Sequence, residues 1–263
     1  RAQNLDSISI KDFEDPLPEN AQLPAVLSRL TRVAVAGTLP PGLLPHLAAV
    51  KALLLSSDPL EDGAPPELSE TGIETGPLLS HLTAFSSSGW PNSARGVLCR
   101  APVALRELQL NRVDTPMMDA LANLLPSLTR LSILNLSLIP PRTLSPALLS
   151  ALPPSTIERL AINVWPPLEL SLHFPHNLHA VVLFARLSPD QPLDFAPFED
   201  ALSWKDRRAP NLDAVGFAIT HLGLEQDGID QRSRFKELGD RAKGFDLLVT
   251  EAPPDLEGED DED

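Results

Sequence analysis

The same short pattern of leucines recurs along the chain, and this repeat restricts the fold more than any other feature of the sequence. Three segments share one pattern: Leu-Thr at the fourth and fifth positions and an apolar residue at the seventh position. These segments are Leu27–Val35, Leu79–Ser87 and Leu125–Ile133. In a chain that is 43% hydrophobic, apolar matches arise by chance, whereas the threonine has no reason to recur in unrelated segments. The repeat therefore predicts a stack of similar structural units.

Weaker copies, with apolar residues at the first, fourth and sixth positions, extend the repeat over most of the chain. Successive copies lie about 27 residues apart on average, and the longer steps require insertions near residues 59–77 and 186–210. We expect one array of about nine to ten strands over residues 1–250. The middle residues of the copies are Ile8, Val33, Leu53, Phe85, Leu108, Leu131, Leu160, Val181, Val215 and Leu247.

The segments between the copies carry the signals of helices. Residues 115–125 and 145–152 each begin with a hydroxyl side chain and a proline and continue with apolar residues at helical spacing. Residues 192–210 and 227–244 are further helix candidates, as longer helices of the outer side or as caps. Stacked strand–loop–helix units predict an α/β solenoid, a horseshoe with parallel strands on its concave side and helices on its convex side.

A strand with the pattern L-x-x-L-x-L followed by a helix resembles the leucine-rich-repeat superfamily, whose repeats are about 20 to 29 residues long. The resemblance covers roughly residues 5–250, and it implies a module that binds a partner protein on the concave face. Irregular spacing, the segments Pro175–Leu178 and Pro210–Leu212 ahead of strands, and an acidic tail look like fungal F-box proteins. This narrower likeness implies the substrate-recognition part of a ubiquitin-ligase receptor. Its F-box, which would contact the ligase adaptor, is expected before Arg1.

Charge and composition exclude several classes of partner. The formal net charge is -15, and residues 251–263, which we expect to be a disordered acidic tail, contribute eight acidic and no basic residues. Such a chain repels phosphate backbones, so we expect no nucleic-acid partner. Cys99 is the only cysteine, and no apolar run is long enough to cross a membrane. We expect a cytoplasmic or nuclear protein with no membrane partner.

The sequence carries no recognisable catalytic motif. Ser86–Trp90 is read as a polar loop after a strand, because no general base is identifiable near it. His173, His176 and His179 are read as solvent-facing residues, because Pro175 interrupts any helix that would align them around a metal. We therefore expect no enzyme, no cofactor and no metal site. A structural scaffold without a ligand site, and an enzyme whose site lies in the insertions, remain the alternatives.

Alternation along the strands predicts which side chains face the partner. Leu108 and Leu110 point inward, so their neighbours point to the concave face, and the following strands continue this surface with Leu134, Ala161 and Ala180 among its apolar members. An alternative is that Glu107 and Arg130 merely pair across adjacent strands and that residues 192–210 cover the C-terminal part. The predicted partner-binding residues are Glu107, Gln109, Asn111, Arg130, Ser132, Arg159, Asn163, Val182 and Phe184.

Overall fold

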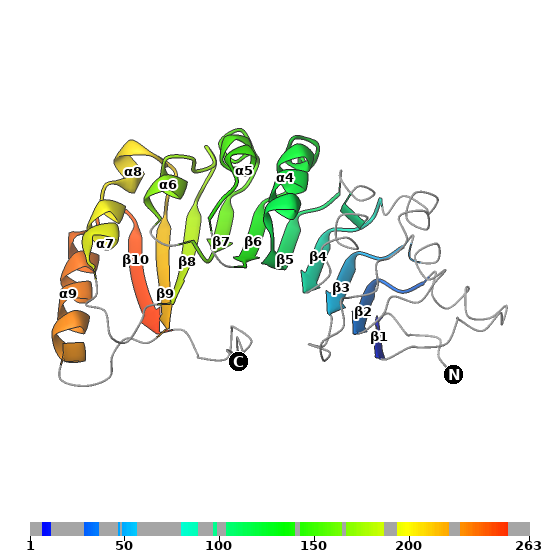
Figure 1. The fold of residues 1–263 in the computed structure, drawn as a ribbon, viewed down its shortest axis with the longest axis horizontal. Coiled ribbons are helices and arrows are strands. Elements are labelled where there is room, and N and C mark those ends of the chain that lie inside the picture. The colour runs from blue at the N-terminus through cyan, green and yellow to red at the C-terminus, as the bar shows by residue number, and fades with distance from the viewer. Residues whose placement is uncertain are drawn as a thin grey trace. The chain divides into compact units, whose positions relative to one another are not determined.

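The structure, a computed structural model, divides into two compact units, Arg1–Ile139 and Pro140–Asp263. In each unit the strands are parallel and follow one another across an open sheet in chain order (Figure 1). The predicted α/β class with a parallel sheet is therefore confirmed. The described residues are 7–11, 29–36, 47, 49–56, 80–88, 97–98, 104–139, 143–164, 167–186, 194–220 and 227–251. The predicted insertion at 59–77 and the tail beyond residue 251 lie outside them.

The described part of the first unit is a sheet with one long connecting helix. Alternate strand residues are buried, as the repeated leucine pattern predicts, and Val33, Phe85 and Leu108 are each at most 2% exposed. Helix α4 (Thr115–Leu124) and the 3-10 helix η2 (Leu125–Ser127) join the fifth strand to the sixth. The strands are β1 (Ser7–Lys11), β2 (Arg32–Ala36), β3 (Ala52–Ser56), β4 (Ala84–Ser88), β5 (Glu107–Val113) and β6 (Ile133–Leu138).

The register of these strands corrects one prediction from the sequence. Leu108 pairs with Leu134, so β6 is centred on Leu134 and not on Leu131. Leucines recur every third residue from Leu125 to Leu134, and this spacing fits the repeat in two registers. The observed register buries Leu131, Leu134 and Leu136 together, to 1%, 0% and 3% exposure. Leu131 is therefore the first leucine of its copy and takes the place that Leu105 has in the previous copy.

A repeated backbone interaction fixes the start of six of the described strands. The carbonyl oxygen of Thr31 accepts hydrogen bonds from the N–H groups of Lys51 and Ala52, at 2.8 and 3.0 Å. The carbonyls of Lys51, Thr83 and Arg106 each accept the same pair of bonds from the next strand, and those of Glu158 and His179 do so in the second unit. The residue directly after the first apolar residue of the copy thus serves as a double acceptor in six of the described repeats.

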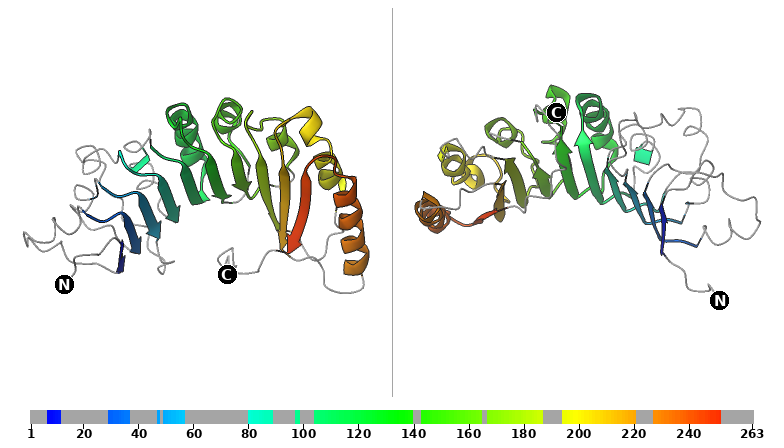
Figure 2. Two further views of the ribbon diagram at one scale, coloured as in Figure 1. Left: turned by 180° about the vertical axis from the view of Figure 1, so that it is seen from behind. Right: turned by 60° about the horizontal axis from the view of Figure 1, so that its bottom comes forward.

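The second unit has four described strands and five described helices. In Figure 2 these helices lie along one face of the strands. The predicted helix at 227–244 is confirmed in the main, as a helix that ends at Arg241 before Gly244, whose φ is 77°. The elements are α5 (Pro146–Ala151), β7 (Arg159–Ile162), α6 (Leu168–Ser171), β8 (Ala180–Arg186), α7 (Ala196–Ala201), α8 (Trp204–Arg207), β9 (Ala214–Thr220), α9 (Asp227–Arg241) and β10 (Asp246–Glu251).

The helix caps are partly those expected. Ser145 caps α5 as predicted, because its Oγ accepts from the Leu148 N–H at 3.2 Å. Helix α4 is capped by Asp114 and not by Thr115, since the Asp114 carboxylate accepts from the Met117 N–H at 2.9 Å. A carboxylate at this position also interacts favourably with the positive end of the helix dipole.

Aromatic side chains fill the core between the sheet and the helices of the second unit. The Phe198 ring on α7 lies 4.7 Å from the Phe217 ring and 4.9 Å from the Phe235 ring, between centroids. Trp204 on α8 and Phe217 are both completely buried. The described residues 194–210 therefore pack on the core side of the sheet. Strand alternation places Val182 and Phe184 on the opposite face, so this segment does not cover them, contrary to the alternative considered above.

The register of β6 is tested by two neighbouring substitutions. Replacing Leu134 with Ala should lower the free energy of unfolding by about 2 to 5 kcal/mol, because it removes buried methyl groups and leaves a cavity. Replacing Ile133 with Ala should lower the free energy of unfolding by less than about 1.5 kcal/mol, because Ile133 is half-buried on the other face. Urea denaturation of both variants measures the difference. Equal losses would contradict the register.

A second stability prediction concerns Arg112, which has a left-handed φ of 58° where β5 holds one residue more than β6. Glycine adopts this conformation without steric penalty, so Arg112→Gly should raise the free energy of unfolding by up to about 1 kcal/mol. Arg106→Gly, on a residue outside the positive-φ region, should instead lower it by about 0.5 to 1 kcal/mol. Thermal and urea melts of both variants test the sign, and destabilisation by Arg112→Gly would refute the account.

Candidate functional site

The sheet of the first unit has a face that is not part of the core, and we call it the open face. Its side chains form rows across the strands because each strand pairs in register with the next. A row near the strand starts consists of Ser7, Arg32, Ala52, Ala84, Glu107 and Ile133. The next row consists of Ser9, Ala34, Leu54, Ser86, Gln109 and Asn135.

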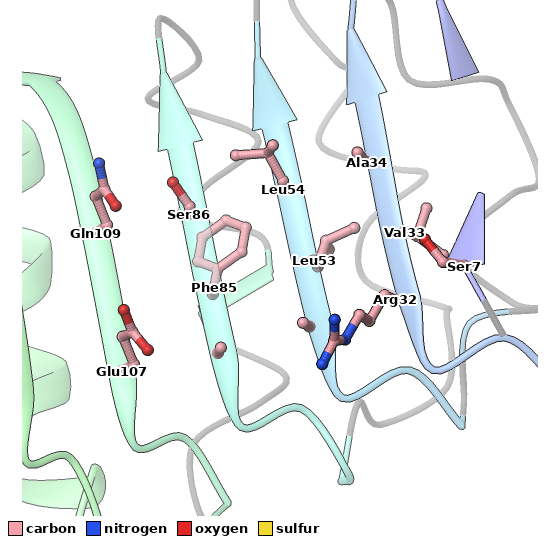
Figure 3. Close-up of a pocket in the computed structure, with 12 residues that line it drawn as sticks. Ser7, Arg32, Val33, Ala34, Leu53, Leu54, Phe85, Ser86, Glu107 and Gln109 are labelled. Atoms are coloured by element: carbon pink, nitrogen blue, oxygen red, sulfur yellow. The ribbon is translucent and has the colours of Figure 1, made fainter. Parts of the chain in front are cut away.

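A shallow recess of about 240 Å³ lies on the open face across β2 to β5. Ala52 and Ala84 are among its lining residues, and their small side chains create the depression because the side chains next to them in the row are long. Figure 3 shows Leu54 and Ser86 on neighbouring strands of the recess, with Gln109 beyond them. The side chain of Leu54 is 41% exposed, so it offers apolar surface to a partner.

Two charged residues stand at opposite sides of the recess. Arg32 on β2 and Glu107 on β5 are both exposed, and three strand spacings separate them (Figure 3). This corresponds to about 14 Å between their backbones. No ion pair neutralises either group within the described ranges. The recess thus combines a small apolar depression with charges of both signs.

The structure places some of the predicted partner-binding residues on the open face and others elsewhere. Glu107, Gln109 and Asn111 lie on it, as predicted. Arg130 does not, because it belongs to the turn before β6. Ser132 also precedes the strand, and its Oγ lies 3.4 Å from the carbonyl oxygen of Arg106.

The shift of register also corrects the direction of Leu134. This residue was predicted to face the partner, but it is completely buried. The open-face positions of β6 are instead Ile133, Asn135 and Ser137, all half-buried. Ile133 and not Arg130 therefore lies beside Glu107, and the alternative of a Glu107–Arg130 pair between facing strand positions is also wrong.

The remaining predicted residues belong to the second unit, where they form a separate surface. Arg159 is exposed at the start of β7, while Val182 and Phe184 are half-buried on β8. Asn163 follows β7 and is only 5% exposed, so it is withdrawn from the accessible surface. This side of β8 is apolar, as predicted, and Val182 pairs in register with Gly216 on the next strand.

Sequence reasoning missed the recess residues on β2 to β4. The signal was available, because Val33, Leu53 and Phe85 were recognised as the middle residues of their copies. The same alternation that selected Glu107 and Gln109 would have selected Arg32, Leu54 and Ser86 on these strands.

The structure also gives the positions of the serine and histidine candidates named from the sequence. The first three residues of Ser86–Trp90 belong to β4 and not to a loop, and Ser87 is only 2% exposed. The His179 Nδ1 lies 2.9 Å from the Asp213 carboxylate. Among the described residues no cluster of three or more histidine, cysteine or acidic side chains is placed to hold a metal ion. In the same part of the chain, no helix has both the length and the apolar character that crossing a membrane requires.

Comparison with known proteins gives no family assignment, since no protein-family model and no curated protein matches the chain significantly. The functional argument therefore depends on the fold and on the geometry of the open face.

The orientation of β4 on this face is tested by a pair of neighbouring substitutions. Ala84→Phe places a ring into open space on a strand, where aromatic residues are tolerated, so stability should change by less than about 0.5 kcal/mol. Phe85→Ala removes a ring that is 1% exposed and should cost about 3 to 5 kcal/mol. Chemical denaturation measures both effects. A large loss for Ala84→Phe would mean that the recess is closed.

Proposed function

We propose that the chain is a leucine-rich-repeat protein that binds another protein on the open face of its first unit and catalyses no reaction. The main observation that supports this proposal is the recess between Arg32 and Glu107. It presents exposed apolar surface at Leu54 beside charged and amide groups on a rigid set of paired strands. Apolar anchors surrounded by polar groups are typical of protein-recognition surfaces.

The size of the recess favours a protein over a small molecule. Its volume of about 240 Å³ is below the roughly 300 to 1,000 Å³ of small-molecule sites, which also enclose most of their ligand. A partner protein needs only to insert one or two apolar side chains over Ala52 and Ala84. The flanking charges then select the orientation of the partner more than they add affinity.

The repeat architecture supports the family assignment. The repeat has the features of a strand-and-helix repeat: an apolar residue at the first position of each copy, parallel strands and middle residues that lie in register. Neighbouring repeats hold each strand rigidly, so side chains on the open face are presented with little loss of conformational entropy on binding.

Site-specific photo-crosslinking tests the binding face. A photoreactive phenylalanine analogue at Ser86, in the recess, should crosslink a discrete protein in a lysate of the organism that makes the chain. The same analogue at Asn123, exposed on α4, serves as the control and should not.

The specificity of this crosslink is checked with Ala84→Phe, which fills the recess. The yield should fall by about tenfold, because the anchor of the partner is excluded from its contact site. A crosslink of equal yield from both positions, or one that the filled recess leaves unchanged, would contradict the proposal.

A further inference from the structure

The exposed charged residues that the structure describes at the strand starts of the first unit are mostly basic, in contrast to the acidic chain as a whole. We propose that this edge recognises an acidic segment of the partner whose apolar side chain occupies the recess. The inference rests on the proposed function, since the edge and the recess belong to one surface. The residues that we call the basic edge are Arg29, Arg32, Lys51, Arg106 and Arg130, and all five are exposed.

These residues lie at or just before the strand starts of four copies. The double hydrogen bonds at the strand starts place Lys51 and Arg106 in one row, two strands apart. Arg29 and Arg130 lie two positions earlier in the second and sixth copies, since each directly precedes the first leucine. Arg32 follows at the edge of the recess. From the second copy to the sixth, the basic edge spans four strand spacings, or about 19 Å.

Among the side chains that the structure describes in the first unit, the charge is opposite in sign to the total charge of -15. They include three acidic side chains, Glu107, Asp114 and Asp119, against six basic ones. Asp114 and Asp119 belong to the cap and body of α4, so of these three acidic residues only Glu107 adjoins the basic edge. The six basic residues are Arg29, Arg32, Lys51, Arg106, Arg112 and Arg130.

An acidic protein segment fits this surface better than a nucleic acid does. Single-stranded nucleic acids are bound largely by stacking of bases on exposed aromatic rings. The described open face offers none, because its one lining ring, Phe85, is 1% exposed and points into the core. The recess supplies an apolar contact instead. An extended segment of about six residues covers the basic edge.

Fluorescence polarisation with the full chain tests the inference. The probe is a fluorescein-labelled peptide of eight residues that contains five glutamates around a central leucine. Lys51→Glu combined with Arg106→Glu should weaken its binding by about tenfold or more, because two attractive contacts become repulsive. Glu107→Gln should strengthen it by about two- to threefold, since it removes the acidic group next to the edge.

A double reversal in the second unit, Lys236→Glu with Lys243→Glu, changes the net charge equally at two exposed positions and should leave the affinity unchanged. The affinity of the wild type should also fall as salt rises from 50 to 300 mM, as expected of exposed charges. Equal weakening by both double variants would overturn the inference, because only total charge would then matter. Tighter binding of a uridine oligonucleotide of the same charge would overturn it in favour of nucleic acid.

Failure of this inference can be distinguished from failure of the proposed function. If Ala84→Phe removes the photo-crosslink while the Lys51→Glu, Arg106→Glu variant retains it and binds the peptide normally, the face is a binding site and its partner is not acidic. If neither variant affects the crosslink, both proposals fail.

Discussion

The double hydrogen bond at the start of six of the described strands is the interaction on which the rest of the structure depends. One carbonyl oxygen, such as that of Thr31, accepts two N–H groups of the next repeat, and this fixes the height of each strand relative to its neighbour. With the height fixed, the middle residues lie side by side in the core, and alternation sends the intervening residues to the open face. The rows of the open face, the recess and the basic edge all follow from this one backbone contact.

This contact also explains how an irregular repeat forms a regular sheet. The leucine-rich-repeat pattern normally contains a buried asparagine or cysteine after the strand, and the chain has Val113 and Ile139 at two such places. The backbone bonds at the opposite end of the strand need no particular side chain, so the positions that make them vary freely among Thr31, Lys51 and Arg106. The spacing between successive copies can then vary because the connections differ in length, while the strands pair in the same way.

Much of the fold could be predicted from the sequence, because buried leucines at a fixed spacing leave little freedom in strand position. The failure at β6 has a physical cause: leucines at every third residue satisfy two registers equally well in a local search. Only the pairing of Leu108 with Leu134 distinguishes them, and this contact spans 26 residues. The site was harder to predict. The recess results from two alanines, Ala52 and Ala84, and the absence of side-chain bulk carries no chemical signal in a single sequence.

The separation of the two faces has an evolutionary consequence. Residues such as Lys51, Ala84 and Arg106 contribute their backbones to the sheet but little of their side chains to the core. Substitutions there can change which partner is bound while the stability of the fold is nearly unaffected. Selection can therefore act on recognition and on folding almost independently, and homologues are expected to diverge fastest in these rows while the inward-facing positions remain apolar.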